Sequence, residues 1–178
     1  MSYLAWVIYF QRIAILVFTW ALFFSGIKES THSSDNGLRV IYFLSPGCTI
    51  CQYYTLEMRK IAEDFHQAEI SFTGVFSASS CDDEVVKSFR EKYEIPFDLV
   101  CDSSLHQTLN ATVTPEVFVL TESGDVLYSG RIDDSYAAIG KRRPRAKHHE
   151  LRDALHALMK GDSIKVSRTT PVGCILQK

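Results

Sequence analysis

A nearly continuous apolar run passes within a few residues into a segment with helical periodicity. The run is "LRVIYFL", Leu38–Leu44, and most of its residues are β-formers. From Thr49 to about Gln67, apolar side chains recur at steps of three and four, as they do on one face of a helix. An apolar run of this kind is typical of a strand that is buried on both faces. The pattern therefore predicts a buried strand followed by an amphipathic helix.

Strand and helix patterns then alternate to the end of the chain. We expect a strand at Glu69–Ala78, a helix at Asp82–Ile95 ended by Pro96, a short strand within 97–102, a short helix at 103–111, two strands within 115–132 joined at Ser123-Gly124, and a last helix at 148–161. This alternation predicts an α/β fold with a central mixed, mainly parallel sheet and helices on both of its faces. The adjoining late strands predict an antiparallel hairpin at one edge.

The chain begins with a segment that a soluble domain rarely carries. Of its 178 residues 46% are hydrophobic, and the formal charge is −2, which suits one globular domain of about 150 residues with an additional segment. This composition excludes a disordered chain and gives no indication of nucleic-acid binding. The additional segment, Leu4–Ile27, is almost entirely apolar and is interrupted mainly by Gln11 and Arg12.

Two interpretations of this first segment stay open. The stretch 13–27 has the length of a signal-peptide core, with Arg12 as its positive flank. Taken from Leu4, the segment is long enough to cross a bilayer as one apolar helix. Bulky Phe23 and Phe24 stand where a cleavage site needs small residues, which slightly favours a retained anchor. A buried core helix is the third and weaker alternative.

Either membrane interpretation exports the rest of the chain. We therefore expect a signal peptide or membrane anchor at 1–27, a polar linker at 28–37, and one domain at 38–178. The domain is expected in the periplasm or an equivalent extracytoplasmic space, either anchored to the membrane or secreted. Disulfides form and persist in such a compartment. The candidates are five cysteines, an odd number: Cys48, Cys51, Cys81, Cys101 and Cys174.

Two of these cysteines lie at a position that supplies chemistry. Cys48 follows the first predicted strand at the turn formed by Pro46-Gly47, and reaction sites of such sheets lie outside the carboxyl ends of the strands. A helix N-terminus stabilises a thiolate through its dipole and its free N–H groups. We expect Cys48 to have the lower pKa and to attack first. Cys51, one turn further along, is expected to resolve the mixed disulfide.

A Thr-Pro sequence supports the same interpretation. Thr114-Pro115 opens a predicted strand, and a proline in this position is a candidate for a cis peptide bond. A Cys-x-x-Cys pair on the first helix of a βαβ unit, followed by Thr-Pro before a late hairpin, resembles the thioredoxin fold.

Four separated motifs narrow this resemblance. From Leu38 to the C-terminus the chain resembles the exported redoxin-domain proteins of the alkyl hydroperoxide reductase/thiol-specific antioxidant superfamily. The motifs that carry the resemblance are "FLSPGCTICQYYTLEMRKI", "TVTPEVFVL", "YSGRIDDSYAAIGKRR" and "TTPVGCIL". The resemblance implies that Thr114 and Pro115 flank the reactive thiol and bind the extended chain of a substrate.

The chain departs from the best-known members of these groups. Thioredoxin itself has Trp-Cys-Gly-Pro-Cys, whereas Thr49 and Ile50 separate the cysteines here, so the redox potential does not carry over. Peroxiredoxins have Pro-x-x-x-Thr-x-x-Cys, but counting from Pro46 the Thr position holds Ile50 and the Cys position holds Tyr53. A direct peroxidase is therefore not expected, and no cofactor is expected either.

A metal-handling or partner-binding module on the same fold is the alternative function. Copper-delivery relatives have three residues between their cysteines and a distant histidine in a nearby loop. Here two residues separate the cysteines, and the loop 131–140 holds no histidine. His148 and His149 open the last predicted helix, where solvent exposure or capping is the plainer expectation. Two thiolates remain chemically able to hold Cu(I) or Zn(II).

The other cysteines and one carboxylate allow two interpretations each. Cys81 and Cys101 end neighbouring predicted strands, and we favour two separate buried residues over a disulfide. Cys174 lies in a Pro/Gly turn, which makes it a candidate auxiliary redox residue that folds back to Cys48 or accepts electrons from a partner. Glu116 is a candidate proton-transfer group for Cys51, although a solvent-facing side chain is the favoured expectation.

The combined prediction is a thiol–disulfide oxidoreductase that acts on exported protein clients through Cys48 and Cys51. Its expected partners are those clients, an electron donor or acceptor, and the membrane through the first segment; nucleic acid is not among them. The sequence does not decide whether clients are reduced or oxidised.

Overall fold

The computed structural model describes residues 37–77 and 81–176. In this part the predicted order is confirmed: β1 (Leu38–Leu44), α2 (Thr49–Asp64), β2 (Ile70–Phe76), α3 (Asp83–Tyr93), β3 (Asp98–Cys101), α4 (Ser103–Thr108), β5 (Glu116–Thr121), β6 (Val126–Gly130) and α5 (Glu150–Met159). The predicted N-terminal apolar helix lies outside the described residues. Among the helices that are described, none has the length and apolar character needed to cross a bilayer.

Four short strands were not predicted. They are β4 (Val113–Thr114), β7 (Tyr136–Ala138), β8 (Lys141–Arg142) and β9 (Cys174–Ile175). None is longer than three residues, so none carries enough sequence to show an alternating pattern. Two of them, β4 and β9, pair with each other, so that the segment around Cys174 lies beside the residues that precede β5.

The central sheet has five strands in the order β3-β2-β1-β5-β6. Its β1/β2 and β2/β3 pairings are parallel, and its β1/β5 and β5/β6 pairings are antiparallel. The sheet is mixed, as expected, but evenly divided rather than mainly parallel. The expected hairpin is β5 and β6, and it contributes two of the five strands, because the chain makes only two helical crossovers before it turns back.

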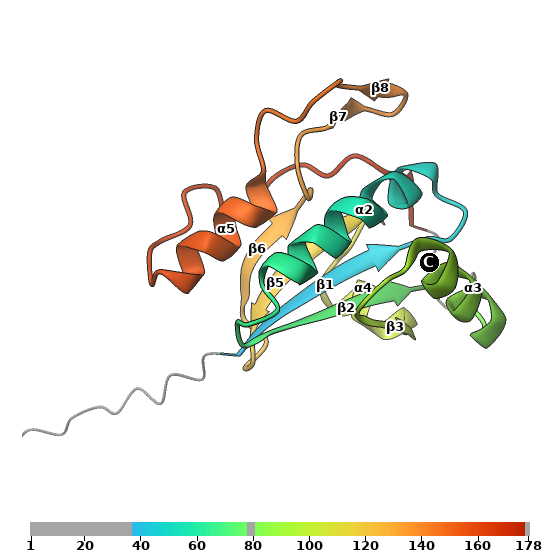
Figure 1. Cartoon of the computed structure of the whole chain (residues 1–178), viewed down its shortest axis with the longest axis horizontal. Coiled ribbons are helices and arrows are strands. Elements are labelled where there is room, and N and C mark those ends of the chain that lie inside the picture. Colours follow the sequence, from blue (N-terminus) through green and yellow to red (C-terminus); the bar gives the residue numbers. More distant parts are fainter. Residues whose placement is uncertain (1–36, 78–80, 177–178) are drawn as a thin grey trace, which may run out of the picture. The chain divides into compact units, whose positions relative to one another are not determined.

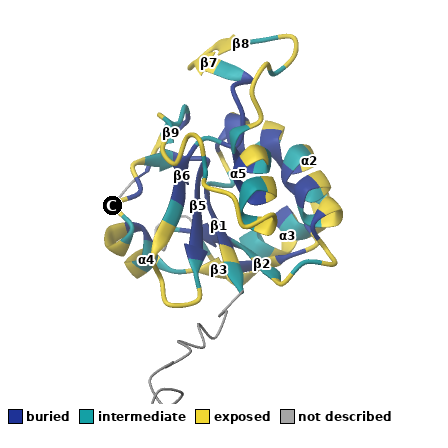
Figure 2. Ribbon diagram, turned by 90° about the vertical axis from the view of Figure 1, so that its left-hand side faces the viewer, coloured by how far each residue is buried: buried dark blue, intermediate teal, exposed yellow. Residues whose placement is uncertain are grey.

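Helices cover both faces of the sheet, and Figure 2 shows α2, α3 and α5 on one side of the strands and α4 on the other. Successive residues of β1 alternate between these two layers. Val40, Tyr42 and Leu44 pack with the helices of the first layer, whereas Ile41 and Phe43 pack in a second cluster with Leu105 of α4. Burial on both faces is the reason why β1 reads as a continuous apolar run.

The helix ends follow local chemistry. Asp82 caps α3, because its carboxylate accepts a hydrogen bond from the backbone N–H of Val85 at 2.8 Å. The helix ends at Tyr93, two residues before the predicted end, since Glu94 adopts a left-handed conformation. The residue before a proline disfavours the α conformation, so Ile95 cannot extend the helix toward Pro96.

The segment after α5 does not end the fold but returns across it. In Figure 1 this red segment extends from α5 toward the beginning of α2. It first runs beside β6, where the N–H of Ser129 donates to the carbonyl of Ser167 and the N–H of Thr169 donates to the carbonyl of Ser129, both at 3.0 Å. Gly130 permits this approach, because a Cβ there would lie 2.2 Å from Thr169 Oγ1.

Candidate active site

Cys48 lies at the corner where β1 ends and α2 begins. It occupies the N-cap position, its backbone N–H donates to the carbonyl of Ser45 at 3.1 Å, and its own carbonyl accepts from the N–H of Gln52 at 3.0 Å. The amide of Gln52 also donates to the carbonyl of Pro46 at 2.8 Å, which fixes the turn. This corner holds the sulfur of Cys48 at the positive end of the helix dipole, where a thiolate is favoured.

Cys51 lies one turn further into α2 and has no exposed surface. Burial raises the pKa of its thiol to about 12, and hydrogen bonding from the Ser45 backbone and from the Thr114 side chain opposes that rise only in part. A thiol with this pKa is protonated at neutral pH. Cys48, at the helix terminus, is also nearly buried, with 2% of its surface exposed. That Cys48 has the lower pKa of the two stays a prediction.

The Thr114-Pro115 peptide bond is cis, which confirms the prediction for this proline. The carbonyl oxygen of Thr114 lies 3.2 Å from Cys48 Sγ. The Thr114 hydroxyl is buried and makes no hydrogen bond of full geometry within the described residues, but it lies near enough to Cys51 to lower the pKa of that thiol. Thr114 thus affects both cysteines, Cys48 through its carbonyl and Cys51 through its hydroxyl.

Glu116 is buried, which overturns the expectation that it faces solvent. Its Oε2 accepts from the backbone N–H of Thr112 at 2.8 Å and from that of Val113 at 3.4 Å. Val117 packs with α2 on the first face of the sheet, so the preceding Glu116 points to the opposite face. The carboxylate therefore shapes the loop before the cis bond and does not approach Cys51.

Cys174 forms a disulfide with Cys48, with 6.1 Å between their Cα atoms. The sequence offered this fold-back as one of two roles for Cys174. Strand β9 pairs antiparallel with β4, so that Cys174 lies opposite Thr114. The structure thus brings together the predicted catalytic, substrate-binding and auxiliary redox residues, which are Cys48, Cys51, Thr114, Pro115 and Cys174.

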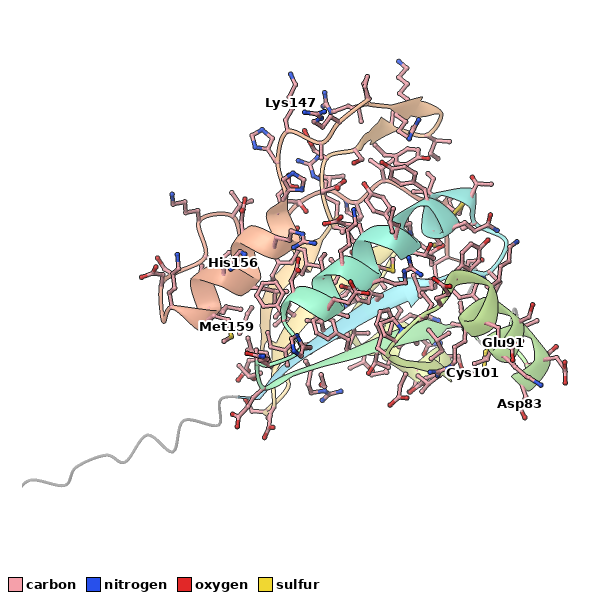
Figure 3. All side chains as sticks on the ribbon, viewed as in Figure 1. Asp83, Glu91, Cys101, Lys147, His156 and Met159 are labelled. Carbon is pink, nitrogen blue, oxygen red and sulfur yellow. A yellow bond between two sulfur atoms is a disulfide. The ribbon has the colours of Figure 1, made fainter. Side chains whose placement is uncertain are left out.

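Cys81 and Cys101 are bonded to each other, so the favoured prediction of two separate buried residues is wrong. The reason is the parallel pairing of β2 and β3, which places Cys101 opposite Phe76 at the same edge of the sheet. Cys81 follows β2 by five residues and reaches Cys101 with 5.8 Å between the Cα atoms. Figure 3 shows Cys101 at the end of β3, on the side of the molecule where α3 lies.

A group of tyrosines beside the cysteine helix was not predicted. The hydroxyl of Tyr54 donates to Asp133 Oδ1 at 2.7 Å, and burial together with this carboxylate raises the pKa of Tyr54. Tyr136 of β7 lies edge-on to the ring of Tyr53, with 5.3 Å between the centroids, and Arg142 of β8 lies over the same ring. The β7–β8 hairpin is therefore packed on the first turns of α2. The helical spacing of Tyr54 was the available signal, but it predicted only an apolar face.

No cluster suited to a metal ion occurs within residues 37–77 and 81–176. His148 and His149 are exposed, and His149 holds the N-cap position of α5 without a side-chain capping bond. The neighbouring Lys147 is labelled in Figure 3 on the loop that leads into α5. Beside the cysteine pair, the described residues offer a third sulfur, that of Cys174, which is bonded to Cys48.

Residues 25–129, more than half of the chain, match the sequence model of the AhpC/TSA family. The chain belongs to the AhpC/TSA family. A comparison with curated proteins finds no significant match. The sequence match shows the family of this AhpC/TSA protein, and solved structures show its fold.

Three solved structures resemble this AhpC/TSA protein over most of its length. An uncharacterized conserved protein from Geobacillus kaustophilus is 22% identical with a TM-score of 0.70, and the match covers 80% of this chain and 78% of that one. A hypothetical protein from Sinorhizobium meliloti is 21% identical with the same TM-score, over 80% of both chains. A thioredoxin-like protein from Aeropyrum pernix is 18% identical with a TM-score of 0.50, over 71% of this chain and 78% of that one. The fold is thioredoxin-like.

Proposed function

We propose that this protein is a thiol–disulfide oxidoreductase that exchanges disulfides with exported protein clients through Cys48 and Cys51. One observation carries the proposal: Cys48 caps a helix N-terminus 3.2 Å from the carbonyl of the cis Thr114-Pro115 bond, with the buried Cys51 one turn behind it. Membership of the AhpC/TSA family supports cysteine chemistry in general, and the fold is one on which such chemistry occurs.

The reaction is a pair of thiol–disulfide exchanges. The Cys48 thiolate attacks one sulfur of a client disulfide, so that a bond forms between Cys48 and the client and the second client sulfur leaves as a thiolate. Cys51 then loses its proton and attacks Cys48 Sγ. The bond between Cys48 and the client breaks, a Cys48–Cys51 disulfide forms, and two electrons have passed to the client. Run in reverse, the same steps oxidise a client dithiol.

Thr114 supports both halves of this reaction. The backbone of β4 at Thr114 offers an edge for an extended client chain, and the following proline keeps the loop turned toward Cys48. The buried Thr114 hydroxyl makes no hydrogen bond of full geometry within the described residues and is therefore available to donate to the Cys51 thiolate, whose pKa it lowers. Thr114 and Pro115 are therefore proposed as substrate-binding residues.

The site of action is proposed to lie outside the cytoplasm. The apolar segment Leu4–Ile27 would direct the domain across a membrane or anchor it there, and a polar linker follows. Such a compartment lets disulfides persist and supplies clients that carry them. An electron donor or acceptor must reset the pair after each exchange. Peroxide reduction is not part of the proposal, since the peroxiredoxin signature is absent from the sequence.

A redox titration with client trapping tests this function. The full chain, purified in a mild detergent because of its apolar first segment, is equilibrated in glutathione buffers of graded potential, and each cysteine is mapped by mass spectrometry. In a Cys174→Ser protein, in which Cys48 cannot pair with Cys174, we expect a reversible Cys48–Cys51 disulfide. In a Cys51→Ser/Cys174→Ser protein, mixed disulfides with clients should accumulate at Cys48, whereas the matched Cys48→Ser/Cys174→Ser protein should trap none. If Cys48 stays reduced at every potential and traps nothing, disulfide exchange is not the function.

A further inference from the structure

We propose that the C-terminal segment Gly173–Leu176 is a tethered substitute for a client, and that Cys174 is a third redox residue of the site. The inference rests on the proposed function and adds to it. In this view the segment occupies the edge where a client chain binds, and Cys174 exchanges disulfides with the pair formed by Cys48 and Cys51.

The first observation is the use of the β4 edge. Val113 and Thr114 pair antiparallel with Ile175 and Cys174, and the N–H of Leu176 donates to the carbonyl of Thr112 at 3.1 Å. An extended peptide that adds to a sheet edge uses main-chain hydrogen bonds of this kind. While β9 is in place, these backbone groups are occupied, so a client cannot pair with the same edge.

The second observation is the fit of the segment around Cys174. A Cβ on Gly173 would lie 2.2 Å from the carbonyl oxygen of Thr114, so only glycine allows this approach. Val172 packs against the core under α2, and Leu176 is buried in the cluster on the opposite face of the sheet. Cys174 lies between these two apolar anchors, whereas the intervening Ile175 is 82% exposed. Buried and exposed side chains thus alternate along this segment, as they do in a strand that is bound on one face, and Cys174 lies on the buried face, where it is bonded to Cys48.

The third observation is the tether. Thr169 Oγ1 accepts from the backbone N–H of Arg131 at 2.9 Å and shares a 3.0 Å hydrogen bond with the hydroxyl of Tyr128. These contacts hold the chain beside β6 independently of the Cys48–Cys174 bond. Only four residues separate Thr169 from Cys174, so an opened segment stays close to its binding edge. Tethering of this kind gives a high effective concentration, against which a free client must compete.

The exchange balances without an external oxidant. Starting from the Cys48–Cys174 disulfide, Cys51 loses its proton and its thiolate attacks Cys48 Sγ. The Cys48–Cys51 bond forms, the Cys48–Cys174 bond breaks, and Cys174 leaves as a thiolate that takes up a proton. Nothing is oxidised or reduced overall, and β9 is then held on the β4 edge only by its hydrogen bonds and apolar anchors, so that a client can displace it. Alternatively, a reductant thiol attacks Cys174, which is more exposed than Cys48, and releases the Cys48 thiolate.

Gly173→Ala tests the inference, because it keeps all five cysteines and adds one methyl group against the Thr114 carbonyl. The control is Ser163→Ala, at an exposed position ten residues upstream of Gly173, in the stretch that follows α5. The full-length proteins are oxidised with glutathione disulfide, and the ratio of Cys48–Cys174 to Cys48–Cys51 is measured by mass spectrometry. We expect mainly Cys48–Cys174 in the wild type and in the control, and a ratio about tenfold or more lower in Gly173→Ala.

A second readout concerns the edge itself. The probe is a synthetic peptide with one intramolecular disulfide, and its steady-state reduction is followed with each protein in excess dithiothreitol, which returns the Cys48–Cys51 disulfide to the dithiol after each turnover; the rate without protein is subtracted. Release of the segment should lower the KM for the peptide by about tenfold in Gly173→Ala if the edge is occupied about nine-tenths of the time in the wild type. Cys174→Ser, which changes one atom and preserves the anchors, should show a smaller decrease in KM.

The outcomes separate the two proposals. An unchanged disulfide ratio together with an unchanged KM in Gly173→Ala, or a wild type that never forms Cys48–Cys174, overturns the tethered-client inference and leaves Cys48–Cys51 exchange intact. Failure of the proposed function has a different signature: Cys174→Ser, with its pair available, would reduce no peptide at all. A lower ratio in Gly173→Ala with peptide reduction retained supports both.

Discussion

Thr114 and Cys174 lie opposite each other in an antiparallel pair of two-residue strands, although 59 residues separate them in the chain. This pairing joins three distant segments at one place: the start of α2, the loop with the cis bond, and the end of the chain. Thr114 contacts Cys48 through its carbonyl and influences Cys51 through its hydroxyl. One residue thereby links the attacking sulfur, the resolving sulfur and the segment that covers them.

Resolution of a mixed disulfide should accelerate steeply with pH. The pKa of Cys51 is about 12, so its thiolate is roughly one part in a hundred thousand at pH 7 and grows about tenfold with each pH unit. The measurement is the rate at which Cys51 displaces glutathione from Cys48 in a Cys174→Ser protein, followed between pH 7 and pH 10 in a rapid-quench experiment. A rate that levels off near pH 8.5 would contradict this prediction, because it would indicate an ordinary thiol.

Thr114→Val should slow the same step. The Thr114 hydroxyl lowers the pKa of Cys51, and valine replaces the hydroxyl with a methyl group of similar size. We expect a rate lower by roughly threefold to tenfold at any pH below 10, since a pKa rise of one unit reduces the thiolate tenfold. Thr112→Val is the control: it also removes a threonine hydroxyl in the same loop, but one that contacts Glu116. If both variants slow resolution equally, the effect comes from the loop and not from the hydroxyl at Cys51.

Local patterns predicted the part of the site that lies within one strand-to-helix unit. The strand at Leu38–Leu44 and the helix after Thr49 were predicted correctly. A strand buried on both faces gives a continuous apolar run, and a helix buried on one face gives apolar residues at steps of three and four, so both are visible over several residues. The placement of Cys48 followed from the junction of these two elements. The cis bond at Pro115 was identified as a candidate from a local feature too, since cis peptide bonds occur almost only before proline.

Contacts between distant short segments could not be predicted in the same way. Strands β4 and β9 have two residues each, and no periodicity can be seen in two residues. The bond between Cys81 and Cys101 depends on which strands are neighbours, and the sequence gives the order of strands in the chain rather than in the sheet. The error at Glu116 has another cause. The sequence showed that Glu116 and Val117 face opposite sides of the strand, but a carboxylate is exposed more often than it is buried, so exposure was expected.

Glu116→Gln should destabilise the loop before the cis bond. The carboxylate accepts hydrogen bonds from the backbone of Thr112 and Val113, and bonds to a charged acceptor are stronger than those to an amide. We expect the free energy of unfolding to fall by about 1–3 kcal/mol in urea titrations. Glu63→Gln, at an exposed position of α2, should change it by less than about 0.5 kcal/mol. Equal stability of the two variants would mean that the Glu116 contacts contribute nothing.

The buried hydrogen bond between Tyr54 and Asp133 should also be visible in stability. Tyr54→Phe leaves the aromatic packing in place but removes the hydroxyl that donates to Asp133 Oδ1 at 2.7 Å. The carboxylate of Asp133 then retains only the hydrogen bond from the backbone N–H of Ser135. Because Asp133 is buried, we expect a loss of about 1–3 kcal/mol. Tyr53→Phe, the adjacent and more exposed ring, is the matched control and should change stability by less than about 0.5 kcal/mol.

Removal of the Cys81–Cys101 disulfide should lower stability without affecting exchange at Cys48. The bond closes a loop of 20 residues, and a cross-link over such a loop reduces the entropy of the unfolded chain by an amount worth about 3 kcal/mol. The double variant Cys81→Ser/Cys101→Ser should therefore unfold at a lower urea concentration under non-reducing conditions, while the disulfides of Cys48 titrate as they do in the wild type. If the double variant unfolds at the same urea concentration as the wild type and the titration of Cys48 is unchanged, these two cysteines are not bonded in solution. If instead stability is kept and the titration of Cys48 shifts, the second pair exchanges electrons with the first, and its role is redox rather than structural.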